Sequence, residues 1–139
     1  MDCKDICSSD YNITHNVSLV LKYNLTQSIQ LGFNYKYATG KPFTPVVGAN
    51  FNSYQNIYKP VYGKTNSVRL PSYQRLDLRL TYLTQLFNNY FSIFYFEALN
   101  ILNINNIFNY SYNFDYTGKK KVTSYFGRRI LVIGMIFNL

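Results

Sequence analysis

Residues 29–37 alternate between apolar and polar or small side chains, and this period of two most constrains the fold. Successive side chains of a β-strand point to opposite faces, so the segment predicts a strand with one apolar face. That face would carry Ile29, Leu31, Phe33, Tyr35 and Tyr37. Related patterns predict four further strands, at about 17–23, 73–82, 90–100 and 129–139. No segment has a helical period, so we expect an all-β chain.

Short and long connections alternate along these strands. Polar turns near 24–26 and 84–89 are short, whereas residues 40–72 are long and rich in Gly, Pro, Asn and Tyr. The aromatic segment 108–116 is expected to extend the fourth strand, and an exposed loop to follow at 118–126. Short turns at one end and long loops at the other are typical of outer-membrane barrels. The expected fold is an antiparallel meander of about five strands from a transmembrane outer-membrane β-barrel. The barrel would be incomplete, because even small barrels need about eight strands.

Charged residues at every second position of the third strand indicate what each face meets. An Arg that faces lipid costs about 2–4 kcal/mol at the bilayer midplane, whereas in a wide barrel it meets water. We therefore expect the charged side chains to face the lumen: Arg75, Asp77, Arg79 and Glu97. The opposite faces are expected to contact lipid through Leu31, Phe33, Leu76, Leu78 and Leu80. A soluble strand with its leucines inward would show the same alternation. Tyrosines at the strand ends favour the membrane, because their rings suit its interface.

The composition excludes several classes of protein. Aromatic residues make up 19% of the chain, but the mean hydropathy is −0.15 and no apolar run is long enough for a transmembrane helix. Most of the basic residues behind the net charge of +8 are scattered, and the run at 119–121 indicates a solvated loop. We therefore expect no binding of nucleic acid. No catalytic constellation is present, so an enzyme is not expected.

The N-terminal residues 1–11 are polar and unpatterned, and we expect them to be disordered or the remnant of a loop. Cys3 and Cys7 would form a disulfide or half of a metal site, or be incidental thiols. No second pair exists to complete a zinc site, so neither a metal nor another cofactor is expected. No signal peptide is visible after Met1, and we expect that Met1 is not the true start of the gene product.

Three segments resemble TonB-dependent outer-membrane receptors, especially those of Bacteroidetes type. Residues 37–45 (YATGKPFTP) are similar to the family's segment before a long extracellular loop. Residues 69–79 (RLPSYQRLDLR) resemble its LPxYxRLDLR strand start, and residues 97–106 (EALNILNINN) its Asn-rich bend. The resemblance covers about residues 13–139, and we expect residues 12–139 to be the C-terminal strands of such a barrel. The last strand is also similar to the barrel-assembly signal, although it ends in Leu where Phe is usual: Leu131, Ile133, Met135, Phe137 and Leu139.

The resemblance implies a transport function. Such receptors take up iron chelates, vitamins, glycans or peptides, and an N-terminal plug, absent from this sequence, couples them to the TonB complex. The implied partners are outer-membrane lipid, the barrel-assembly machinery and the TonB complex. The substrate is unknown, because the substrate-binding residues of the family cannot be transferred to this sequence. The alternatives are an outer-membrane barrel without a transport function and a soluble, lipocalin-like ligand-binding barrel.

Overall fold

The computed structural model describes residues 9–86, 90–123 and 128–138. Within these ranges the chain forms eleven β-strands and no helix, so the all-β expectation is confirmed. No helix in the described residues is long and apolar enough to cross a membrane.

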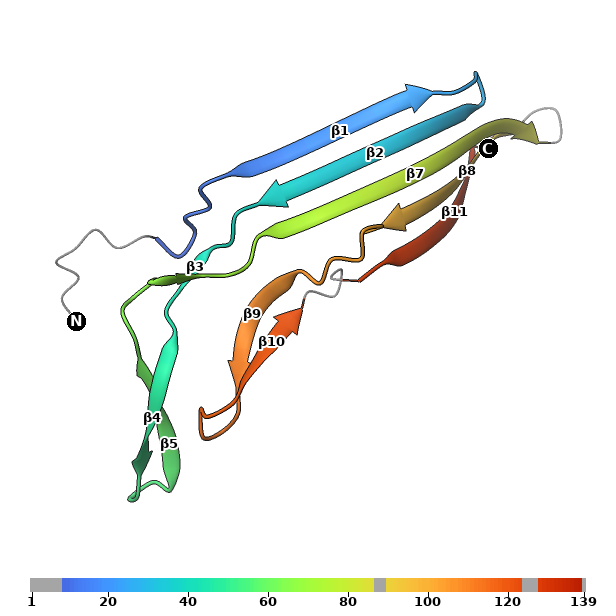
Figure 1. Ribbon diagram of the computed structural model, residues 1–139. Helices are drawn as coiled ribbons and strands as arrows, with labels where there is room; N and C mark the ends of the chain where they lie inside the picture. The colour runs from blue at the N-terminus through green and yellow to red at the C-terminus, as the bar shows by residue number, and fades with distance from the viewer. Residues whose placement is uncertain (1–8, 87–89, 124–127, 139) are drawn as a thin grey trace.

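Five long strands form one antiparallel sheet in the order β1-β2-β7-β8-β11 (Figure 1). Strands that follow one another along the chain are therefore neighbours once the small strands between them are set aside, as the expected meander requires. No closed barrel is formed, and the described strands β1 and β11 each have one neighbour. The strand bounds are Asn16–Asn24 (β1), Ile29–Ala38 (β2), Tyr73–Leu86 (β7), Tyr90–Leu99 (β8) and Ile130–Asn138 (β11).

The connections lie at the ends where the sequence predicts them. The short turn between β1 and β2 is at one end of the sheet, and the long insertions extend from the other (Figure 1). The Thr26 hydroxyl stabilises the short turn, because it accepts hydrogen bonds from the N–H groups of Ser28 and Ile29 at 3.2 and 3.0 Å. The predicted end of the third strand at Tyr82 is wrong. The ladder with β8 continues to Leu86, and residues 87–89 of the predicted turn lie outside the described residues.

The two predicted long loops contain ordered strands. The segment between β2 and β7 forms two small sheets, and the segment between β8 and β11 forms a hairpin that pairs only with itself. The expectation that residues 108–116 extend the fourth strand is therefore wrong. The added strands are Pro42–Phe43 (β3) with Val68–Arg69 (β6), Val46–Asn52 (β4) with Ile57–Tyr62 (β5), and Ile107–Tyr112 (β9) with Lys119–Thr123 (β10).

A close backbone crossing joins the large sheet to the small ones. A Cβ atom on Gly40 would lie 1.6 Å from the carbonyl oxygen of Leu70, so only glycine fits there. The Leu70 N–H donates to the carbonyl of Lys41 at 3.0 Å, and Leu70 is one of the few buried side chains. The Arg69 guanidinium donates to the carbonyls of Gly40 and Asn12 at 3.0 and 2.8 Å. The close approach of residues 39–41 and 69–71 therefore requires glycine at position 40, and the Arg69 side chain holds the two segments together.

Candidate functional site

The strand register divides the side chains of the large sheet between two chemically different faces. Residues paired across antiparallel strands share a face. One cross-strand row contains Leu31, Leu80, Phe96 and Ile133, and the next row contains Gly32, Arg79, Glu97 and Val132. The predicted separation of the leucines from the charged residues is therefore confirmed. Whether lipid or water meets each face remains a prediction.

The apolar face contains all the described residues that the sequence assigned to lipid or to the terminal signal. It remains uncovered, with Ile133 82% exposed and Leu131 61% exposed. Within the described ranges, the only buried aliphatic or aromatic side chains apart from Pro42 are Leu70 and Ala98. The assigned residues on this face are Leu31, Phe33, Leu76, Leu78, Leu80, Leu131, Ile133, Met135 and Phe137. Leu139 lies outside the described residues.

A network around Asp77 organises the opposite face. Asp77 is only 5% exposed, and its carboxylate accepts three hydrogen bonds. The donors are the Arg75 guanidinium at 2.7 Å, the Asn100 backbone N–H at 2.9 Å and the Asn34 amide at 3.4 Å. These donors lie on β2, β7 and the bend after β8. The carboxylate therefore joins three parts of the chain that are distant in sequence.

Arg79 and Glu97 lie farther along the same face. They are partners in the ladder between β7 and β8, and the Arg79 guanidinium stacks 4.3 Å from the centre of the Tyr95 ring. The Tyr95 ring in turn covers Gly134 on β11, where an added Cβ would lie 2.1 Å from the ring. This contact across three strands was not predicted from the sequence, although a glycine opposite an aromatic residue in the register is a detectable signal.

The Asn-rich bend after β8 is held by its own side chains. Asn100 is fully buried with a φ of 51°, and its amide exchanges two hydrogen bonds with the backbone of Ile104, at 3.0 and 3.2 Å. The Asn106 side-chain amide pairs with the backbone of Gln74 as a neighbouring strand would. Its oxygen accepts from the Gln74 N–H at 2.9 Å, and its nitrogen donates to the Gln74 carbonyl at 2.8 Å. Asn tolerates positive φ better than most residues. These two asparagines, six residues apart, therefore have a structural role in this chain.

The β4–β5 hairpin and the β9–β10 hairpin contact each other through aromatic side chains. The ring centres of Tyr58 and Phe114 lie 6.1 Å apart, edge to face. The ring of Phe43, in the neighbouring strand β3, lies 5.2 Å from that of Tyr110 in β9. Phe51 extends this contact, with its ring 4.9 Å from that of Tyr58. These distances are in the range in which aromatic pairs attract one another.

The hairpin end of the sheet is also strongly basic. Asp115 is the one acidic residue in segments 39–72 and 101–129, and its carboxylate is bound to Thr117 within its own turn. Lys119 stacks on Tyr110, with the ammonium 3.7 Å from the ring centre. The basic residues of the two segments are Lys41, Lys59, Lys64, Arg69, Lys119, Lys120, Lys121, Arg128 and Arg129.

No metal centre is formed by the described residues, because no group of three or more His, Cys, Asp or Glu side chains comes together there. Cys3 and Cys7 lie outside the described residues. The candidate functional site is therefore the sheet itself, with its apolar face, its charged face and the hairpins at one end.

No protein-family model, curated protein or solved structure matches this chain. Its function has to be argued from its own residues and geometry.

Proposed function

We propose that this chain forms the C-terminal strands of the β-barrel of a TonB-dependent outer-membrane receptor that imports a nutrient. The apolar face would contact lipid, and the face with Arg75, Asp77 and Arg79 would line the lumen. The observation that carries the proposal is a large, uncovered apolar face on a sheet whose opposite face is charged. In water such a face promotes aggregation, whereas in a bilayer its apolar side chains contact lipid.

The sheet edges support the proposal. The described strands β1 and β11 each have one neighbour, so each presents unpaired backbone groups along one side. Unpaired edges are not tolerated in lipid, where each free N–H or C=O costs several kcal/mol. Further barrel strands would remove both edges. These strands would come from the rest of the receptor.

A soluble, lipocalin-like barrel is less well supported. Such a barrel closes around an interior that holds the apolar side chains. Here the sheet is open, and the polar network around Asp77 occupies one face while Leu131 and Ile133 remain exposed on the other. Closing the sheet into a barrel would require more strands than the five it contains.

The proposed location brings a set of partners. Strand β11 would be recognised by the barrel-assembly machinery, and outer-membrane lipid would surround the apolar face. Coupling to the TonB complex would require a plug domain encoded upstream. The imported nutrient would be an iron chelate, a vitamin, a glycan or a peptide.

Adjacent residues on opposite faces provide the test of the membrane assignment. In a Cys3→Ser/Cys7→Ser background, Leu78→Cys and Arg79→Cys are single cysteines one position apart on β7. After insertion into lipid vesicles with the further barrel strands supplied upstream, we expect a bilayer-restricted maleimide to label the first variant, and a membrane-impermeant maleimide the second. Equal labelling of both variants by the impermeant reagent would refute the membrane assignment.

A second measurement separates a receptor from an outer-membrane barrel that transports nothing. Sequencing the DNA upstream of the Met1 codon should show, in the same frame, further strands preceded by a plug domain. An upstream frame that encodes barrel strands and no plug would support the non-transport alternative.

A further inference from the structure

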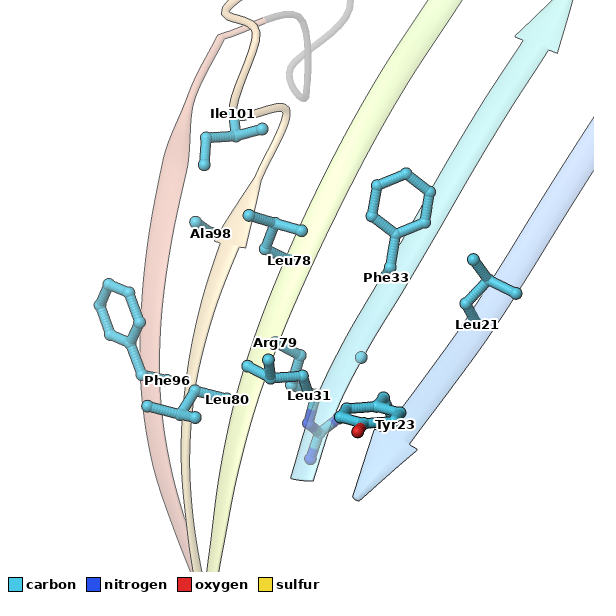
Figure 2. A pocket seen from close by; sticks show the side chains of 11 residues that line it. Leu21, Tyr23, Leu31, Phe33, Leu78, Arg79, Leu80, Phe96, Ala98 and Ile101 are labelled. Atoms are coloured by element: carbon cyan, nitrogen blue, oxygen red, sulfur yellow. The ribbon is translucent and has the colours of Figure 1, made fainter. Parts of the chain in front are cut away.

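A groove crosses the apolar face between two rows of side chains. One wall is the row of Leu21, Phe33 and Leu78, the upper row in Figure 2. The other wall is the row of Leu31, Leu80 and Phe96, the lower row. Ala98 makes the groove deeper, because its methyl group stands where neighbouring positions carry larger side chains. The groove has a volume of about 520 Å³, and its walls are almost entirely apolar. Such a hollow fits a flexible hydrocarbon chain better than it fits a polar ligand.

A fixed cation lies beside the β8 end of this groove. Ile101, which follows β8, lines the groove at that end (Figure 2), and its carbonyl accepts a hydrogen bond of 2.7 Å from the Arg129 guanidinium. The Arg129 backbone N–H donates to the Asn103 side chain at 3.1 Å, so both ends of this residue are held. The Arg129 side chain is exposed and has no carboxylate partner among the described residues. A guanidinium has five N–H donors, and the bond to Ile101 uses one of them.

We propose that the groove and Arg129 together bind one phosphate-bearing anionic lipid of the surrounding membrane. One acyl chain would lie in the groove between the two rows, and the phosphate would accept hydrogen bonds from the guanidinium of Arg129. The charge complementarity at the groove end distinguishes this occupant from a neutral lipid. Guanidinium groups suit phosphate, because their paired N–H donors match two phosphate oxygens. The inference rests on the proposed membrane location of the apolar face.

The chain contains no tryptophan, so a single introduced Trp is a clean reporter. Phe96→Trp places it in the groove, and Met135→Trp places a control on the same face but outside the groove lining. The chain is joined to its upstream barrel strands, with any Trp there replaced by Phe, and inserted into vesicles of equal parts phosphatidylglycerol and phosphatidylcholine, with brominated acyl chains on one lipid at a time. We expect the brominated phosphatidylglycerol to quench the groove Trp preferentially, with about fivefold enrichment, the size expected for one basic residue beside anionic lipid. The control Trp should be quenched equally by both lipids.

Two neighbouring arginines form a matched pair for the charge. Arg129→Gln removes the guanidinium but keeps a donor for the Ile101 carbonyl, and Arg128→Gln removes the same charge one residue away. We expect the first change to abolish the preference for phosphatidylglycerol and the second to preserve it. Equal loss in both variants, or no preference in the unchanged chain, would overturn the inference alone. A lack of quenching by either lipid would refute the proposed membrane function and this inference with it.

Discussion

The large sheet and the two hairpins at its end are stabilised in different ways. In the sheet, long backbone ladders and the Asp77 network on one face hold the strands, while the apolar side chains of the other face contact little. In the hairpins, which are ladders of only a few residues, aromatic rings contact one another from strand to strand. The hairpins therefore make aromatic contacts of their own, with Phe114 still 81% exposed, whereas the sheet depends on what covers its apolar face.

This difference has an energetic consequence. Burying a large aliphatic or aromatic side chain contributes about 1.5–3 kcal/mol, and in water the sheet obtains little of this from residues such as Leu131 and Ile133. A bilayer, further strands or another protein would have to supply that contribution. Matched substitutions can test the two regions separately. The stability of each variant is measured in detergent micelles unless another readout is named.

The largest effect is expected at the crossing that joins the two regions. Gly40→Ala would place a methyl group against the backbone of Leu70, and we expect the free energy of unfolding to fall by about 3 kcal/mol. Gly48→Ala in β4 is the control, since nothing lies within 4 Å of the added atom, and its effect should be within about 0.5 kcal/mol. Urea titration followed by circular dichroism measures both. Similar stabilities of the two variants would show that the crossing is not tight.

A smaller loss is expected from the carboxylate that organises the sheet. Asp77→Asn keeps the size of the side chain but removes the ion pair with Arg75 and one acceptor of the network, which should cost about 2 kcal/mol. Asp115→Asn makes the same chemical change in an exposed hairpin turn, where the carboxylate accepts hydrogen bonds from Thr117. Thermal unfolding should therefore distinguish the two variants. If Asp115→Asn destabilises the chain as much as Asp77→Asn, the two regions do not differ as described.

The sequence predicted the large sheet well because one rule determines it. Alternation alone assigns Phe33 and Leu78 to one face and Asp77 to the other, and ladder pairing preserves that assignment across strands. The small strands between β2 and β7 escaped prediction because the prolines of that segment indicate a loop. Pro42 and Pro60 nevertheless lie in strands, in two-stranded sheets where one side of each strand needs no N–H donor.

The details of the site depend on contacts between distant segments. Asp77 meets the N–H of Asn100 because the chain turns at a residue with positive φ, which no periodicity reveals. The stacking of Arg79 on Tyr95, and of Tyr95 over Gly134, likewise requires knowledge of the exact register of three strands. The alternation of apolar and polar residues with a period of two thus predicts which face of the sheet a side chain occupies, but not which partner it contacts.

The aromatic contact between the hairpins should have a measurable coupling energy. A double-mutant cycle with Tyr58→Ala and Phe114→Ala should give about 0.5–1 kcal/mol, as is usual for aromatic pairs. Hydrogen exchange of the hairpin amides is the suitable readout, because opening of a hairpin need not unfold the sheet. Tyr54, which is 97% exposed, supplies the control cycle with Phe114, where we expect no coupling. Equal coupling in both cycles would contradict a specific contact.

The smallest effect is expected for the exposed turn of the β9–β10 hairpin. Hydrogen bonds from the Thr117 backbone N–H, and then from its hydroxyl, lower the pKa of the Asp115 carboxyl below its ordinary value of 3.8. Because the folded pKa is the lower one, the stabilisation is complete above the unfolded pKa and is lost as the pH falls through the folded pKa. The turn should therefore loosen only below about pH 4, where carboxylates protonate. A loss of order already near neutral pH would contradict this origin.

Thr117→Val separates the two hydrogen bonds, since it removes the hydroxyl and keeps the backbone N–H. We expect the pKa of Asp115 to rise toward 3.8 without reaching it, because the backbone hydrogen bond makes the larger contribution. An NMR titration of the Asp115 carboxyl carbon measures the change, and hydrogen exchange across the large sheet should be unaffected. An unchanged pKa in the variant would show that the hydroxyl contributes nothing. A change that spreads into β7 or β8 would mean that the hairpin and the sheet are coupled, contrary to the independent packing inferred for the hairpins.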